Sequence, residues 1–229
     1  MSEIQAAAAA LQERFGLDAV MERPVFELHC RLSKEVAGRQ VRLHLYRGGR
    51  KGEPLVYILE GTLEPVEVAA RTSLSVQLAG ARSKSVLPGI DILPNLTPDL
   101  RVFVNGFDER HVVDATDPGL ACALLQDERV RQSVVEICYW GGRVALHPPD
   151  RLAIHVECRT GLAPRAVPAV AALLRLAAYL EELKDIEPLD VHDVVDTAAT
   201  GTMSGAPVAI PDVMEPETGL WLKKLLGKK

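Results

Sequence analysis

Short segments in which apolar and polar residues alternate constrain the fold of this chain more than any other feature. The alternation runs through residues 25–32 and 41–46, and it returns in residues 143–147 and 151–158 on either side of a Pro-Pro-Asp turn. A repeat of two gives a strand one apolar and one polar face, which is typical of an antiparallel sheet covered on one side. The pattern therefore predicts a mainly antiparallel sheet, with a meander of four or five strands in the first 80 residues.

Helical spacing of apolar residues predicts a helix at residues 4–15 and two to three further helices packed on the sheet. Asp117 and Pro118 form a typical helix start, because the carboxylate caps free amides and proline is tolerated in the first turn. Asp127 is predicted to cap a second helix. The chain is therefore assigned to the α+β class.

The last predicted helix is apolar on almost every side. It begins at Pro164 or Pro168 and ends near Lys184, and its residues 169–178 are almost all apolar. A helix of this kind is packed on two sides. We therefore expect it to lie on its own sheet and to offer residues 168–184 as the contact of a homodimer.

Charge and cysteine content narrow the classes of function. The chain has 229 residues, with 26 Lys and Arg against 31 Asp and Glu, for a formal net charge of -5. This balance disfavours a protein that coats nucleic acid. The N-terminus lacks the basic start of a signal peptide, and the four cysteines form no CxxC pair. We therefore expect a cytoplasmic protein with reduced thiols, no metal and no cofactor.

The composition changes sharply after Lys184. Residues 185–217 contain eight acidic residues, four prolines and no lysine or arginine, which is typical of a flexible linker. Residues 218–229 combine four lysines with five large apolar residues. The sequence therefore predicts four parts: an N-terminal helix at 1–16, one α+β domain at 17–184, an acidic linker, and a cationic tail.

The tail, residues 218–229, carries the leading hypothesis for function. On a helix its apolar and basic side chains separate onto two sides, so the tail is predicted to be a short amphipathic helix. Such a segment lies on an anionic membrane surface or fills a groove of a partner protein. We therefore expect a non-enzymatic interaction or adaptor protein, peripheral to the inner face of the membrane if that surface is its target. Docking of the tail on its own domain is the alternative. The predicted contact residues are Leu220, Trp221, Leu222, Lys223, Lys224, Leu225 and Leu226.

A small-ligand enzyme of the hydrolase type is the competing hypothesis. Asp108, His111 and Asp114 lie in the densest cluster of titratable residues outside the linker. An imidazole beside a carboxylate can perform acid/base catalysis near neutral pH. The simpler interpretation places Asp108 in a solvated loop and Asp114 in a turn. The sequence carries neither a nucleophile-elbow motif nor a phosphate-binding loop.

Two pairs of histidines lie on predicted strands. His29 and His44 face each other directly if the turn between their strands is centred just before Ala37, and a shift by one peptide removes this pairing. Two imidazoles fall short of the three or four ligands of a zinc site, so no metal site is predicted. His147 and His155 are predicted to lie on opposite faces of their hairpin.

The order of elements in the second half of the chain forms a recognisable pattern. A strand precedes a turn that contains Asp114, and a helix of the form Ala-x-x-Leu-Leu follows at residues 121–125, before a hairpin at 144–156 and a closing helix. This pattern resembles uncharacterised bacterial domains of unknown function. The resemblance covers about residues 25–184 and implies neither an activity nor functional residues.

Overall fold

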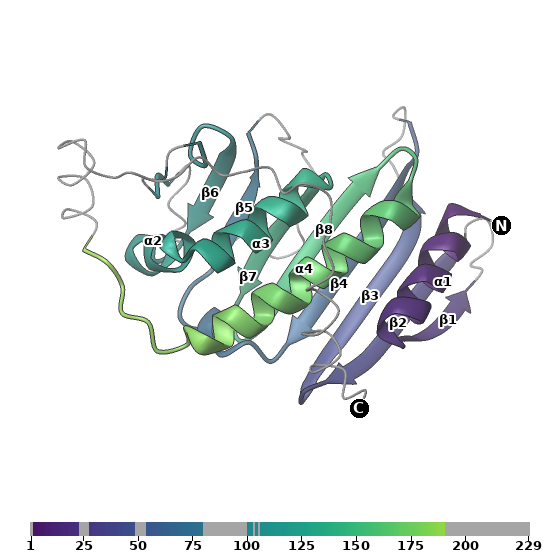
Figure 1. Cartoon of the computed structure of the whole chain (residues 1–229), viewed down its shortest axis with the longest axis horizontal. Helices are drawn as coiled ribbons and strands as arrows, with labels where there is room; N and C mark the ends of the chain where they lie inside the picture. The colour runs from purple at the N-terminus through teal and green to yellow at the C-terminus, as the bar shows by residue number, and fades with distance from the viewer. Residues whose placement is uncertain are drawn as a thin grey trace.

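The computed structural model in Figure 1 shows one large sheet with helices against it. The structure describes residues 2–22, 28–48, 54–79, 100–102, 104 and 106–190. The tail, and all of the predicted linker beyond residue 190, lie outside these ranges. The described strands are β1 (Asp18–Glu22), β2 (His29–Val36), β3 (Arg39–Gly48), β4 (Val56–Glu64), β5 (Leu74–Leu78), β6 (His111–Ala115), β7 (Gly142–His147) and β8 (Arg151–Cys158).

Every described strand is antiparallel to its neighbours, in the order β1-β2-β3-β4-β8-β7-β5-β6. Strands β1 to β4 form a meander, whereas β5, which the prediction also placed in the meander, lies between β7 and β6. The β7–β8 hairpin then lies between β4 and β5, so that β4 pairs with a strand almost one hundred residues later in the chain. The α+β class and the mainly antiparallel sheet are confirmed.

The four α-helices among the described residues lie against one face of this sheet (Figure 1). The longest, α4, crosses the sheet between α1 and α3. The core forms between the helices and the strands, where Leu43, Leu59, Val156 and Leu173 are fully buried. The helices are α1 (Glu3–Phe15), α2 (Pro118–Gln126), α3 (Glu128–Tyr139) and α4 (Leu162–Glu182).

The predicted helix starts at Asp117 and Asp127 are confirmed. The Asp117 carboxylate accepts the N–H of Leu120 at 2.9 Å, and Asp127 accepts amides from the first turn of α3. The helix predicted at residues 4–15 is α1, which begins with a capping box between Ser2 and Gln5. Short side chains at these positions satisfy amides that have no partner within the helix.

The last helix, α4, begins at Leu162, so Pro164 lies in its first turn close to the predicted start, whereas a start at Pro168 is wrong because this proline lies inside the helix. The first amides of α4 find a partner on another helix: the Glu3 carboxylate accepts the N–H groups of Gly161 and Leu162 at 3.2 and 3.1 Å. A proline inside a helix removes one backbone hydrogen bond. Packing of α4 on both sides stabilises the helix across this defect.

The apolar character of α4 is explained by contacts within the chain, since the sheet, α1 and α3 all pack against it. Among the described helices, α4 alone is long and apolar enough to cross a membrane by length and composition. Its buried residues belong to the hydrophobic core, as expected for the central helix of a two-layer domain. A homodimer through residues 168–184 stays a prediction.

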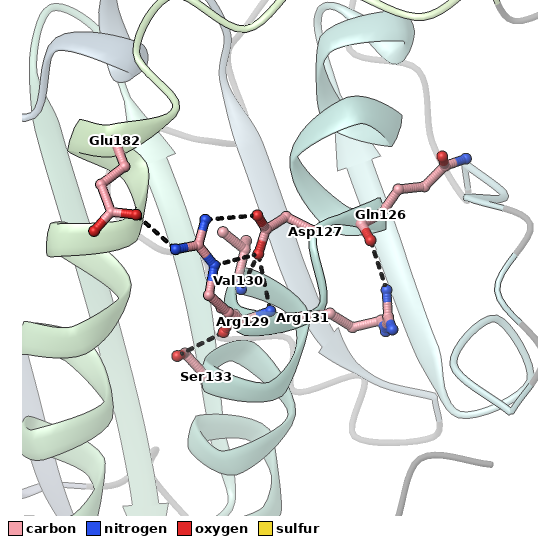
Figure 2. Close-up of polar contacts among 7 residues, drawn as sticks. All are labelled: Gln126, Asp127, Arg129, Val130, Arg131, Ser133 and Glu182. Atoms are coloured by element: carbon pink, nitrogen blue, oxygen red, sulfur yellow. Dashed lines mark hydrogen bonds and ion pairs between the residues drawn. The ribbon is translucent and has the colours of Figure 1, made fainter. Parts of the chain in front are cut away.

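Figure 2 shows how polar contacts join α2, α3 and α4. The guanidinium of Arg129 donates to Asp127 at 2.9 Å and to Glu182 at 2.6 Å, which ties the start of α3 to the end of α4. Arg131 donates to the backbone carbonyl of Gln126 at 3.1 Å, so the turn between α2 and α3 is also held. These contacts hold the end of α2, the start of α3 and the end of α4 together.

Candidate functional site

Alternate residues of the strands point away from the helices and form what we call the open face of the sheet. None of the four described helices covers this face. The register places one polar row across five neighbouring strands. This row consists of Arg31, His44, Glu60, His155 and Arg143. Charged groups that are far apart in sequence therefore meet at the centre of the open face.

The carboxylate of Glu60 lies at the centre of this row. The phenol of Tyr46 donates to Glu60 Oε1 at 2.7 Å, and the Nδ1 atoms of His155 and His44 lie 3.6 and 3.8 Å from its two oxygens. The imidazoles of His155 and then His44 hold the pKa of Glu60 well below its usual range, against the opposing effect of burial. Glu60 is therefore an anion that its neighbours stabilise.

The network continues on both sides of Glu60. His155, whose side chain is only 9% exposed, also contacts Glu157 at 2.7 Å through Nε2. Burial, followed by the hydrogen bond to Glu60, raises the pKa of the Tyr46 phenol, which stays protonated at neutral pH. The titratable groups at the centre thus contact one another across β3, β4 and β8.

His29 and His44 meet, although not as direct neighbours across the two strands. The hairpin turn falls at Ala37 and Gly38, which is the one-peptide shift that removes the direct pairing, so Arg31 is opposite His44. The two imidazoles still approach diagonally, with His29 Nδ1 and His44 Nε2 separated by 3.1 Å. The ring of Tyr46 stacks on both imidazoles. Within the described ranges, no group of three or more His, Cys, Asp or Glu residues is arranged to hold a metal ion.

A groove with a volume of about 560 Å³ lies over strands β1 to β4 on this face. Its polar lining includes Glu22, Arg31, Arg42, His44, Glu60 and Thr62. The side chains of Arg31 and Arg42 are 64% and 58% exposed, although each pairs with a carboxylate, Arg31 with Glu22 and Arg42 with Glu64. The groove therefore offers accessible groups of both charges.

Of the candidate acid/base residues, His111 and Asp114 lie within strand β6, although a turn was predicted at Asp114, and Asp108 lies just before the strand. The Asp108 carboxylate accepts the backbone N–H groups of Val102 and Val104 at 3.0 and 3.2 Å, and so holds this segment. His111 is buried on the helix-covered face, and its Nδ1 lies 3.0 Å from the Phe107 carbonyl oxygen. Burial lowers the pKa of His111, so the neutral imidazole is favoured.

Asp114 does not join His111, because successive residues of a strand point to opposite faces. Asp114 lies opposite Ser75 on the open face, whereas His111 lies opposite Leu78 on the covered face. By the same rule the prediction for His147 and His155 is wrong: with Arg151 opposite His147, both histidines lie on the open face. The sequence-predicted acidic and imidazole groups are thus distributed over two faces.

The four cysteines are free thiols and all are buried. Burial raises the pKa of Cys138 to about 12 and that of Cys122 to about 11. A thiol with such a pKa is a poor nucleophile at neutral pH. These side chains therefore act as small apolar groups in the core.

Comparison with protein-family models finds no match to this chain, and comparisons with curated proteins and with solved structures find none either. The residues themselves must therefore carry the functional argument. Of the residues in this network, the sequence pointed to His29 and His44 as a pair and to His155 as a strand residue, whereas Tyr46 and Glu60 were not among the candidates. Alternation indicated that His44 and Tyr46 share a face, whereas the pairing of β4 with β8 had no local signal.

Proposed function

We propose that this is a non-enzymatic interaction protein whose tail, residues 218–229, docks to an anionic membrane surface or to a partner protein. The observation that carries the proposal is the separation of this cationic, apolar tail from a domain whose core is complete among the described residues. Between Asp190 and the tail lie 27 residues, 191–217, without a lysine or arginine. The tail is thus tethered to the domain by an acidic segment.

The point where this tether leaves the domain is fixed. Arg71 donates to the backbone carbonyls of Lys184 and Ile186 at 2.7 and 2.8 Å, and the N–H of Leu189 donates to the Gly119 carbonyl at 3.1 Å. These bonds hold residues 184–189 against the domain beside α2. Because the tether starts at a fixed point, the tail can explore only a limited volume around the domain. The effective concentration of the tail is therefore raised near any surface that the domain approaches.

The chemistry of the tail suits an anionic target. Lys223, Lys224, Lys228 and Lys229 add attraction to a negative surface, while Trp221 and the leucines add apolar area. A segment of about 12 residues is too short to form a stable helix alone, so we expect it to fold on its target. In a cell this arrangement corresponds to a cytoplasmic protein peripheral to the inner membrane face.

The contacts of the acid/base candidates favour binding over the hydrolase hypothesis. Asp108 is engaged by two backbone amides, and His111 lies behind Phe107 on the covered face. On the open face, the Glu60 network is engaged by its own histidines and tyrosine. These arrangements support a surface that binds rather than a centre that moves protons.

Co-sedimentation of the full chain with vesicles tests the proposal. Neutral phosphatidylcholine vesicles are compared with vesicles that also contain phosphatidylglycerol, each at low and high salt. We expect binding to the anionic vesicles only, weakened by salt. The double variant Trp221→Ser, Leu222→Ser should lose this binding, whereas Leu55→Ser, which removes an exposed apolar residue from the domain, should keep it.

A protein target gives a different pattern in the same samples. In that case no vesicle binds, and the full chain retains a single protein from a cell extract that the Trp221→Ser, Leu222→Ser variant does not retain. Binding to neither target, or binding that is equal in the tail variant and the unaltered protein, would contradict the proposal.

A further inference from the structure

The two edges of the sheet differ. At the β6 edge, the N–H of Leu100 donates to the Val113 carbonyl at 2.7 Å, so another segment already lies beside this strand. At the other edge, β1 pairs only with β2 among the described strands. Val20 and Met21 on β1 are 59% and 42% exposed. An edge strand with exposed apolar side chains offers unpaired backbone groups to an incoming strand.

The charged residues of β1 determine which kind of strand can pair with its edge. Asp18, Val20 and Glu22 point to the open face, and Ala19 and Met21 point to the helix side. Two copies of β1 pairing antiparallel about Val20 would place Asp18 opposite Glu22 of the partner, and like charges in this position are destabilising. The pattern instead fits a strand with basic residues four positions apart and an apolar residue midway between them.

We propose that residues 224–228 of the tail add to β1 of the same chain as an antiparallel strand. This segment reads Lys-Leu-Leu-Gly-Lys, and β1 reads Asp-Ala-Val-Met-Glu. In the antiparallel register each lysine is opposite a carboxylate and each leucine is opposite an exposed apolar side chain. The pairs are Lys224 with Glu22, Leu225 with Met21, Leu226 with Val20, Gly227 with Ala19, and Lys228 with Asp18.

The antiparallel direction fits the surroundings of β1 better than the parallel one. Ala19 packs against the core beneath α1, so a residue without a side chain is the best neighbour there, and the antiparallel register supplies Gly227. A parallel register would place Leu225 at this position and leave Gly227 beside the exposed Met21. On the open face, Val20 and Glu22 line the groove, so Leu226 would cover one of its walls.

The tether is long enough for this contact. Asp190 and Lys224 are 34 positions apart, which gives a flexible chain a root-mean-square span of about 32 Å. The eight strands, spaced by about 4.8 Å, place β1 roughly 34 Å from β6, and α2, where the chain leaves the domain, lies at the β6 end (Figure 1). A tether whose natural span matches the separation gives the highest effective concentration.

Docking on β1 would withdraw two lysines and two leucines from an external target. The β1 contact therefore competes with the membrane or partner contact of the proposed function, although it does not depend on that function. The β1 edge is the surface on which the tail would lie when no target is present.

Hydrogen exchange of the full chain, read by mass spectrometry on peptides that span β1, tests the inference. Lys228→Glu should remove the attraction to Asp18 and increase the exchange rate of the β1 amides by about fivefold. Asp18→Lys should do the same, and the combination of both changes should restore slow exchange. Lys229→Glu, which makes the same change of net charge one position beyond the proposed pairing, should leave β1 exchange unchanged.

Equal β1 exchange in the unaltered protein and in Lys228→Glu would overturn the inference, and so would a combined variant that restores nothing. Protection that increases with protein concentration would also overturn it, because the tail would then come from a second copy. Vesicle binding measured on the same proteins separates the two proposals. The β1 inference fails alone if the protein binds anionic vesicles while the charge variants leave the exchange of the β1 amides unchanged. The proposed function fails alone if β1 protection is present and no target binds.

Discussion

The two faces of strand β4 place very different residues one position apart. On the covered face, Leu59 and Gly61 are buried beneath the helices. On the open face, Glu60 and Thr62 stay partly exposed and line the groove. The same backbone thus supports an apolar core on one side and a charged network on the other.

The covered face of the sheet contributes most of the stability of the fold, whereas the open face is accessible to water. The covered face excludes water, so its stability depends on apolar burial and on the close approach of α4. The open face keeps its charges in water, and contacts among half-exposed charges contribute little to stability. We therefore expect substitutions along β4 to alternate between large and small effects on the free energy of unfolding.

Leu59→Ala should have the largest effect. Leu59 is fully buried, and truncation of a core leucine leaves a cavity, so we expect a loss of about 3 kcal/mol. Urea unfolding followed by circular dichroism measures this loss. Ser33→Ala, at an exposed position of the open face, is the control and should stay close to the unaltered protein. A loss below about 1 kcal/mol for Leu59→Ala would mean that the core at β4 is loosely packed.

Gly61→Ala should have the next largest effect. A Cβ at this position would lie 2.9 Å from Ile154 Cγ1 and 3.1 Å from a methyl carbon of Leu43, with Leu173 of α4 also close. Relief of these contacts requires side chains in a packed core to move, so we expect a loss of about 2 kcal/mol. The same urea titration measures it. Unchanged stability would show that the side chains of Ile154 and Leu43 can move aside at no cost.

Glu60→Gln should have a smaller effect that depends on pH. Because the pKa of Glu60 is lowered in the folded state, its ionisation stabilises the fold above the ordinary pKa of glutamate, about 4.3, and this contribution declines as the pH falls toward the lowered value. Glu60 is 35% exposed, so solvent screens its contacts and we expect a loss of only about 1 kcal/mol at pH 7.

Unfolding of Glu60→Gln and of the unaltered protein at pH 7 and at pH 3 measures this dependence. The difference in stability between the two proteins should be smaller at pH 3, where Glu60 of the unfolded chain is protonated. An equal difference at both pH values would show that shape, and not the charge of Glu60, determines its contribution.

The comparison also shows which features local sequence can predict. Alternation of apolar and polar residues specifies the two faces of a strand, and a capping aspartate such as Asp117 marks a helix start, because both signals act over a few residues. Pro168 is a local signal that gives the wrong result. Its preference for the start of a helix is overcome by the packing of α4 and by Glu3, which accepts the first amides of the helix from far away in the sequence. The turn expected at Asp114 is instead part of strand β6, because a five-residue strand carries a weak pattern.

The contacts at the centre of the open face could not be predicted from any short segment of the sequence. His44 and Tyr46 could be placed on one face from their spacing alone. The contact between Glu60 and His155 depends on the position of the β7–β8 hairpin beside β4, and this arrangement follows from how the whole sheet packs beneath α4. The diagonal contact of His29 with His44 required the position of the turn to within one residue.

Thr62→Val should have the smallest effect and tests whether the open face is free in solution. The two side chains have nearly the same shape, and Thr62 is only partly buried, so we expect a change in unfolding free energy within about 0.5 kcal/mol. A loss above about 1.5 kcal/mol would mean that the Thr62 hydroxyl is buried against something in the native protein. If that loss also increased with protein concentration, the covering surface would be a second copy, and the face would be an interface that supports the fold. A small change at every concentration is the result expected of a face that water covers and that a binding partner can reach.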